Sequence, residues 1–257
     1  MPVLVELFPC RTDNYGYLIH DIDSRRTAAI DAPDAQVIEA VLRQRGWTLT
    51  DVLLTHHHRD HIEGVTALKS DFNVTVTGPR SEADKIPGLD VGIGPGDIVM
   101  LGNTALLAIG TPGHTLGHLA YYDATGGHLF SGDALFSLGC GRMFEGTPGP
   151  MWEGLKALRA LPEQTLLYCG HEYTIENARF AETVDPQNAA LRIRISEARR
   201  IRGDGHPTIP VTLGMEKRTN PFLRADQPAL ARAMGLDTDL DPSAVFAALR
   251  QAKDDFT

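Results

Sequence analysis

A chain of 257 residues, of which 42% are hydrophobic, can bury a substantial core in one large domain or in two unequal ones. Its formal charge of −9 repels phosphate backbones and anionic lipid surfaces, which argues against nucleic-acid and membrane partners. The N-terminal segment lacks a basic stretch followed by an apolar one, and no run of about 18 apolar residues occurs in the sequence. We therefore expect a cytoplasmic protein.

The three cysteines, Cys10, Cys140 and Cys169, are odd in number and lack the CxxC spacing of sulfur-ligated zinc sites. They are expected to be reduced and mostly buried. Cys169 lies two positions before His171 and is a conceivable nucleophile, but a metal-binding role suits that histidine better.

The first part of the chain is predicted to alternate short β-strands with helices. The first expected strands are Val3–Leu7, Tyr15–Ile19 and Thr27–Ile30. The third runs into Asp31, and Asp34 is placed to cap a helix whose apolar residues recur with helical spacing until Gly46. The apolar run 52–54 follows as a buried strand and ends directly in the segment THHHRDH.

Hairpins, a helix and a further buried strand are predicted between residues 98 and 169. The expected strands are Ile98–Leu101, Ala105–Ile109, Leu119–Tyr122, His128–Ser131 and Leu166–Cys169. Residues 152–161 have the apolar spacing of a helix, and helical patterns recur at 191–201, 228–235 and 243–253. We predict a larger domain of mixed α and β structure over 1–172 and a smaller, mainly helical domain over 173–257.

Four histidines and an aspartate crowd into residues 56–61, directly after the buried strand. His56, His58 and His61 offer imidazoles, and Asp60 offers a carboxylate, on one short segment. A purely structural role is a poor explanation, because burying unpaired polar groups is costly. His57 alternates with its neighbours and is expected to point away in a supporting role. The segment therefore predicts a metal site.

Three further candidate ligands stand at predicted strand ends, namely His114 in TPGHT, Asp133 in FSGDALF and His171 in YCGHEY. Each follows a glycine, which lets the backbone turn sharply and aim the side chain beyond the strand. Any one of them alone would more often be an ordinary loop residue. Asp31 could accept a hydrogen bond from a ligand imidazole or could simply form a turn.

This series of motifs, HxHxDH, GHT, GD and GHE, resembles the metallo-β-lactamase superfamily in its binuclear hydrolase form, over the chain to about residue 175. The resemblance implies an α+β fold, an αββα sandwich with the site on one edge. The implied ligands of one metal ion are His56, His58 and His114. Those of the other are Asp60, His61 and His171, and Asp133 is implied to bridge the two ions.

These ligand types suit two divalent ions, with zinc expected and iron or manganese as alternatives, since no cysteine is among them. Two ions roughly 3.5–4 Å apart can share a water and hold it as a bridging hydroxide, which is the expected nucleophile. Asp60 and Asp133 are the catalytic residues expected to work with that hydroxide. No Ser-His-Asp arrangement is then needed.

The second half is similar to glyoxalase II, the hydroxyacylglutathione hydrolase family, through GCGRMFEGT at 139–147, GHEYT at 170–174, TNPFLR at 219–224 and RQAKDDF at 250–256. The resemblance implies hydrolysis of S-(2-hydroxyacyl)glutathione, typically S-D-lactoylglutathione, to glutathione and D-lactate in methylglyoxal detoxification. The implied substrate-binding residues are Arg142, Phe144, His171, Tyr173, Arg250 and Lys253. A small-molecule thioester is thus the expected partner of a monomeric enzyme.

Two positions depart from the family pattern. Arg142 replaces the usual lysine and keeps its charge, while Phe144 replaces an aromatic hydroxyl and removes one hydrogen-bond donor. Outside the family pattern, Arg250 and Lys253 would be read as a solvated helical face. The arginines at 192–202 are also expected to form a solvated face rather than a nucleic-acid site.

Alternatives on the same fold are a glutathione persulfide dioxygenase with a single iron and another hydrolase such as a lactonase. The TNPFLR segment in a long helical C-terminal region argues against the dioxygenase. A lactonase would leave the C-terminal basic residues unexplained. A binding module without catalysis is disfavoured because all seven ligand positions are filled.

Overall fold

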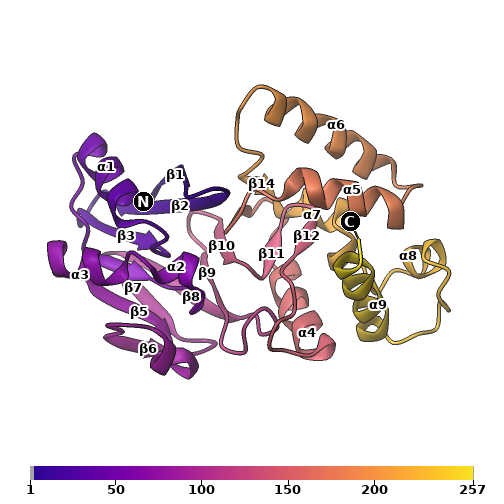
Figure 1. Ribbon diagram of the computed structural model, residues 1–257, viewed down its shortest axis with the longest axis horizontal. Coiled ribbons are helices and arrows are strands. Elements are labelled where there is room, and N and C mark those ends of the chain that lie inside the picture. Colours follow the sequence, from indigo (N-terminus) through magenta and orange to yellow (C-terminus); the bar gives the residue numbers. More distant parts are fainter. Residues whose placement is uncertain (1–2, 257) are drawn as a thin grey trace. The chain divides into compact units, whose positions relative to one another are not determined.

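The computed structural model describes residues 3–256 and divides the chain into two compact units. The first unit holds the residues up to Gly110 together with Thr115–Gly132. The second holds Thr111–His114 and the chain from Asp133 onward. In Figure 1 the first unit runs from indigo to magenta and the second ends in yellow.

The first unit contains a six-stranded sheet in the order β1-β2-β3-β4-β5-β6. Its strands are β1 (Leu4–Cys10), β2 (Asn14–Asp21), β3 (Arg26–Ile30), β4 (Asp51–Leu53), β5 (Thr75–Pro79) and β6 (Val91–Ile93). The strands from β1 to β3 pair antiparallel and those from β3 to β6 pair parallel. Parallel neighbours carry their C-terminal ends to the same edge, so the loops that follow β3 and β4 meet there.

Helices α1 (Ala35–Arg45) and α3 (Val65–Phe72) cover one face of this sheet. Asp34 caps α1 by accepting from the backbone N–H groups of residues 36 and 37, and Gly46 ends the helix in a left-handed conformation at φ 68°. The apolar side of α1, with Ile38 and Leu42, packs into the core beneath the strands. The predicted cap and stop of this helix are both confirmed.

A second sheet in the first unit joins β7 (Ile98–Leu101), β8 (Thr104–Gly110), β9 (Leu119–Asp123) and β10 (His128–Gly132) as an antiparallel meander. Its inner face meets the first sheet. The rings of Tyr17 and Phe130 lie 5.7 Å apart, and the Tyr121 hydroxyl donates to the carbonyl of Leu54 at 2.7 Å. This hydrogen bond holds the backbone at Leu54, two positions before the first residue of the histidine-rich loop, His56.

The second unit is mainly helical. Its helices are α4 (Pro148–Arg159), α5 (Thr174–Val184), α6 (Ala189–Gly203), α7 (Leu213–Thr219), α8 (Pro228–Ala233) and α9 (Pro242–Asp254), with a 3₁₀ turn at Pro221–Leu223. Its short strands pair as β11 (Leu135–Phe136) with β12 (Gly139–Cys140), and as β13 (Leu166–Cys169) with β14 (Val211–Thr212). Trp152 of α4 stacks near Phe246 of α9, with ring centroids 6.0 Å apart.

The arginines of α6 do not all face solvent as the sequence predicts. Arg194 is 3% exposed and donates to the Ser137 hydroxyl and the Thr208 carbonyl, so the expected solvated face is wrong for this residue. Its neighbours Arg192, Arg199 and Arg200 are exposed. A buried guanidinium needs several acceptors, which a helical wheel alone does not reveal.

None of the helices within residues 3–256 combines the length and the apolar character needed to cross a bilayer.

Candidate metal centre

The histidine-rich loop begins at the end of β4 and is fastened to the end of β3. Ala32 donates its N–H to the carbonyl of His61 at 2.7 Å, and Gly64 donates to the carbonyl of Ala32 at 2.8 Å. Between them lies α2 (Arg59–Ile62), a single helical turn that carries Asp60 and His61. His56 and His61 are buried, while Asp60 remains partly accessible. The loop therefore presents several donor atoms from a fixed backbone.

Asp31 sets the orientation of two of these imidazoles. Its Oδ2 accepts from Nδ1 of His61 at 2.8 Å, and its carboxylate also accepts from the Thr55 hydroxyl and the Thr55 N–H. Because the Thr55 proton is directed to Asp31, the Thr55 oxygen accepts from Nδ1 of His56, 2.9 Å away. Both imidazoles thus carry their proton on Nδ1 and leave Nε2 as the ligand atom.

Two further residues support the loop without contributing expected ligands. Asn14 of β2 donates its amide to Oδ2 of Asp60 at 3.0 Å. His57 bonds through Nδ1 to the buried Glu82 at 2.8 Å, and Glu82 also accepts from the N–H of Gly117 at 2.8 Å. His57 therefore serves the supporting role that its alternation with His56 and His58 predicts.

In the second unit Asp133 lies between two expected histidine ligands. Its Oδ2 is 3.3 Å from Nε2 of His114 and 3.4 Å from Nε2 of His171. Nδ1 of His114 donates to the carbonyl of Arg142 at 2.9 Å, which again leaves Nε2 as the ligand atom. All three residues are no more than 6% exposed. One oxygen of the Asp133 carboxylate thus lies beside an imidazole nitrogen of each of two expected ligands.

Glycine is required before two of these ligands. Gly132 has φ 49°, and a Cβ there would lie 2.6 Å from the Thr55 hydroxyl. Gly113 has φ 146°, and a Cβ there would lie 2.5 Å from the Met151 side chain. Both positions combine a backbone conformation that favours glycine with space for no side chain. The glycines before His114 and Asp133 therefore do what the sequence predicts.

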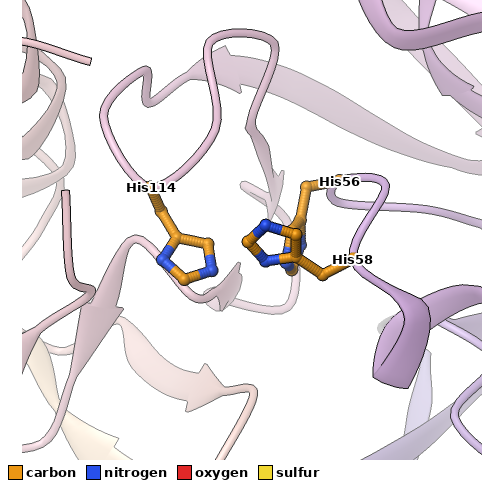
Figure 2. Close-up of side chains that lie close together, drawn as sticks. All are labelled: His56, His58 and His114. Atoms are coloured by element: carbon orange, nitrogen blue, oxygen red, sulfur yellow. The ribbon is translucent and has the colours of Figure 1, made fainter. Parts of the chain in front are cut away.

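The expected ligands gather into compact groups. Figure 2 shows the imidazoles of His56, His58 and His114 close together, and their ligand atoms lie within 4.8 Å of one another. The same spacing holds within the set formed by Asp60, His61 and His171. Imidazole nitrogens and carboxylate oxygens without a thiolate suit zinc, iron or manganese, so the residues fit divalent cations. Asp31 is near His56 and His61 too, but it accepts from Nδ1 of His61 and reaches His56 only through the Thr55 hydroxyl.

The expected substrate residues near the metal ligands differ in their environment. Tyr173 stacks flat on the His171 ring, with centroids 4.7 Å apart and an interplanar angle of 5°. Phe144 is 60% exposed, and its ring meets that of His114 at 5.3 Å. The exposed Arg142 donates from Nε to Asp254 at 3.3 Å. The exposed Arg142 guanidinium lies over the Phe144 ring, 5.8 Å from its centroid, and is chemically able to hold a carboxylate.

Arg250 and Lys253 lie on α9 but do not form a solvated face. Arg250 is 4% exposed and donates to the carbonyls of Cys140 and Gly141, at 3.0 and 3.3 Å, and to Asp254 at 2.9 Å. The ammonium of Lys253 lies over the rings of Phe180 and Phe256, and burial followed by the charge of Arg250 lowers its pKa. Arg250 therefore holds, by hydrogen bonds, the backbone that directly precedes Arg142.

The cysteines are poor nucleophiles in this fold. Burial raises the pKa of the Cys140 thiol to about 11 and that of Cys169 further, so both stay protonated near neutral pH. The Cys169 thiol donates to the carbonyl of His171 at 3.3 Å. The free thiols are buried, as the sequence predicts.

Sequence reasoning missed several residues that support the centre, above all Asn14, Thr55, Glu82 and Asp254. Thr55 directly precedes the histidine segment, and that position was the only signal available for it. The other three reach the centre from distant segments, where an isolated amide or carboxylate has many ordinary uses.

Comparisons with known proteins agree with this geometry. The family model described as "Metallo-beta-lactamase superfamily" matches residues 26–171, and "Hydroxyacylglutathione hydrolase C-terminus" matches residues 172–256. A "Hydroxyacylglutathione hydrolase" of Rhizobium meliloti is 50% identical over 252 residues, 98% of each chain. One of Ruegeria pomeroyi is 48% identical over 256 residues, the full length of both.

Among solved structures, that of TTHA1623 "in a di-iron-bound form" has a TM-score of 0.61 and 26% identity, and the match covers 86% of this chain and all of that one. The ligand motifs, the layered sheets of the first unit and the full-length similarity lead to one conclusion. The chain belongs to the hydroxyacylglutathione hydrolase family and has the metallo-β-lactamase fold with the helical C-terminal domain of that family.

Proposed function

We propose that this enzyme hydrolyses S-(2-hydroxyacyl)glutathione thioesters, typically S-D-lactoylglutathione, to glutathione and a 2-hydroxy acid, as the second step of methylglyoxal detoxification. The observation that carries the proposal is the full-length identity of about half to proteins named hydroxyacylglutathione hydrolase, in a chain that retains every expected ligand. The leaving thiolate comes from a thiol with a pKa of about 8.5 and can depart without full protonation. A thioester therefore needs no dedicated general acid.

We propose two divalent cations per chain, with zinc expected and iron or manganese possible on the same donors. His56, His58 and His114 would hold one, Asp60, His61 and His171 the other, and Asp133 both. The di-iron form named for the similar TTHA1623 supports a count of two. When bound, such a pair of ions lowers the pKa of water toward about 7 and polarises a carbonyl oxygen.

The chain's own residues prepare that chemistry by fixing the ligands. Asp31 and the Arg142 carbonyl hold His61 and His114 with Nε2 directed inward. Asn14 holds Oδ2 of Asp60, which stays partly accessible and is placed to take the proton of the water that becomes the attacking hydroxide. Asp133 places its Oδ2 beside Nε2 of both His114 and His171. These side chains do not have to reorganise during the reaction.

The glutathione part is proposed to bind Arg142, Phe144, His171, Tyr173, Arg250 and Lys253, so that residues 173–257 act as a helical domain beside a catalytic domain of 1–172. Glutathione carries two carboxylates, and an acidic protein must concentrate cations to hold them. Arg142 is the exposed cation of this set, and the flat Tyr173 ring offers a surface for the peptide.

We further propose a monomer in the cytoplasm. A single chain supplies all seven expected ligands, and its three free, buried thiols suit a reducing compartment. Sedimentation of the metallated enzyme tests the first point, because a stable dimer would contradict it. Fractionation of cells that express the enzyme tests the second.

The deciding experiment measures thiol release from S-D-lactoylglutathione by the purified enzyme before chelation, after chelation and after zinc is restored. We expect turnover that is lost with the metal and regained with it. A folded, fully metallated enzyme without turnover would contradict the proposal. Oxygen uptake with glutathione persulfide on a single iron would then favour the dioxygenase.

A matched pair of variants on one segment sharpens this test. His58→Gln should lose metal and activity together. His57→Gln should keep both, because a glutamine amide can still donate to Glu82, with which His57 bonds at 2.8 Å. Equal losses in the two variants would argue that the whole loop, rather than particular ligands, is responsible.

A further inference from the structure

The β11–β12 hairpin (135–140) joins several expected site residues of the second unit. Asp133 lies two positions before it, and Arg142 lies two positions after it. Its ends are held together, since Gly141 donates to the carbonyl of Ala134 at 3.3 Å and a Cβ on Gly141 would lie 1.9 Å from the Asp133 carbonyl oxygen. Any change in the path of this hairpin therefore moves the backbone of Asp133.

The same hairpin orients two histidines. The carbonyl of Arg142, just past its end, accepts from Nδ1 of His114 at 2.9 Å. Phe136, within it, lies against the rings of His171 and Tyr173, at 6.1 and 5.3 Å between centroids. All three expected metal ligands of the second unit thus adjoin one short hairpin.

The turn of the hairpin is held by side chains from the helical segments. Glu216 of α7 accepts from the Ser137 hydroxyl at 2.9 Å and from the N–H of Leu138 at 2.8 Å. Asn220, at the end of α7, donates to the carbonyls of Phe136 and Gly139 at 3.1 and 2.9 Å. Leu138 has φ 59°, a conformation that a leucine adopts only when its surroundings impose it.

This group is buried and mutually bonded. Glu216 and Asn220 are both 0% exposed, and the Asn220 amide lies 3.0 Å from Oε2 of Glu216. Arg194 donates to the Ser137 hydroxyl at 3.3 Å, so that hydroxyl links the buried cation to the buried carboxylate. A buried charge of this kind is costly unless each bond is made, which ties the turn to one geometry.

We infer that Glu216 and Asn220 are positioning residues of the metal centre, which act through the 135–140 hairpin on Asp133 and His114. The C-terminal segment then does more than bind the glutathione part of a substrate, because it also holds the backbone on which metal ligands stand. This inference rests on the proposed function, since it takes Asp133 and His114 as ligands.

Glu216→Gln is the variant to measure, because it keeps the shape but puts an NH₂ group, which cannot accept, in place of one of the two oxygens that accept from Ser137 or from Leu138 and Asn220. The metal-free proteins are titrated with zinc against a chromophoric chelator, and thermal unfolding of each is recorded without metal. Outer partners of metal ligands typically change affinity 10–100-fold, so we expect about 10-fold weaker binding of zinc by the variant.

Leu230→Ala is the matched control. Leu230 is a fully buried residue of α8 in the same unit that belongs to neither the hairpin nor its hydrogen bonds. It should lower the unfolding temperature while zinc affinity stays within about 2-fold of the parent. A merely structural role for Glu216 would make its variant behave in the same way.

Ser137→Ala is a milder second variant should Glu216→Gln fail to fold, because it removes only the hydroxyl between Arg194 and Glu216. We expect a smaller loss of zinc affinity in the same direction. Folded variants with parental affinity would overturn the positioning role and leave the proposed function standing. A parent chain that binds no divalent cation would instead overturn the proposed function and, with it, this inference.

Discussion

The expected metal ligands and the expected glutathione-binding residues are held in different ways. His61 and His114 are buried, and each has a second partner that fixes its proton on Nδ1. Arg142 is exposed and donates to Asp254. Arg250 is buried and donates to the backbone carbonyls of Cys140 and Gly141. The orientation of the expected metal ligands is thus fixed before a metal ion binds. Arg142 and Arg250, in contrast, bond to protein groups that a substrate would have to displace.

This difference teaches where each kind of change should appear. Disturbing a ligand or its outer partner should alter metal content and the rate of the chemical step. Disturbing a substrate residue should alter KM first, because its effect is on binding. Asp254 lies within reach of both Arg142 and Arg250, so a substrate carboxylate that binds Arg142 must compete with it.

The largest effect is expected for Asp133→Ala. Its Oδ2 lies within 3.4 Å of both His114 and His171, so its loss should abolish two-metal occupancy. Because outer partners alone are worth 10–100-fold, we expect kcat/KM to fall by more than about 100-fold. Metal analysis and thiol release measure the two effects. A variant with full activity and one retained ion would break the bridging role.

Asp31→Ala comes next, because it removes the acceptor for His61 and for Thr55 without removing a ligand. We expect zinc affinity to fall about 10–100-fold in a chelator competition. Asp34→Ala is the matched control on the same turn. It removes a helix cap and should cost about 1 kcal/mol of stability while zinc affinity is unchanged.

On the substrate side, Arg250→Ala combined with Lys253→Ala should raise KM for the glutathione thioester more than it lowers kcat. Charge-assisted hydrogen bonds are worth about 1.5–3 kcal/mol, which corresponds to roughly a 10–100-fold rise in KM. The exposed pair Arg199→Ala with Arg200→Ala on α6 removes the same charge as a control. An unchanged KM in the first variant would remove both residues from the site.

The pKa of Lys253 gives this prediction a pH dependence. Burial and the neighbouring Arg250 lower that pKa, so the ammonium loses its proton at a lower pH than an ordinary lysine. KM should therefore begin to rise on the alkaline side earlier in the parent than in Lys253→Arg, whose guanidinium stays charged. Parallel pH profiles would contradict a binding role for the ammonium.

The smallest effect is expected for Phe144→Tyr. This change returns a hydroxyl to a ring that is 60% exposed, and one hydrogen bond contributes about 0.5–1.5 kcal/mol. We expect KM to fall by roughly 2–10-fold, with kcat and metal content unchanged. Phe144→Leu controls for loss of the ring against His114. A KM that is unchanged or higher in Phe144→Tyr would count against the expected pocket.

Much of the fold is predictable because its signals are local. The cap at Asp34 and the stop at Gly46 bound α1, and Leu166–Cys169 is the strand the apolar run predicts. The β11–β12 hairpin was not predicted, because its turn contains the left-handed Leu138 and is held by residues about 80 positions away. Distant side chains impose the conformation of Leu138, so no local sequence pattern predicts the hairpin.

The sequence by itself determined the ligand types and their family, because metal coordination demands particular side chains and the densest group lies on one short segment, His56–His61. Only the tertiary structure decided which partners fix those ligands, since Asp31, Asn14 and Arg142 reach them across the fold. The structure also showed that Arg194 and Arg250 are buried donors rather than solvated charges. Burial and hydrogen bonding depend on three-dimensional neighbours, which residue type and spacing leave open.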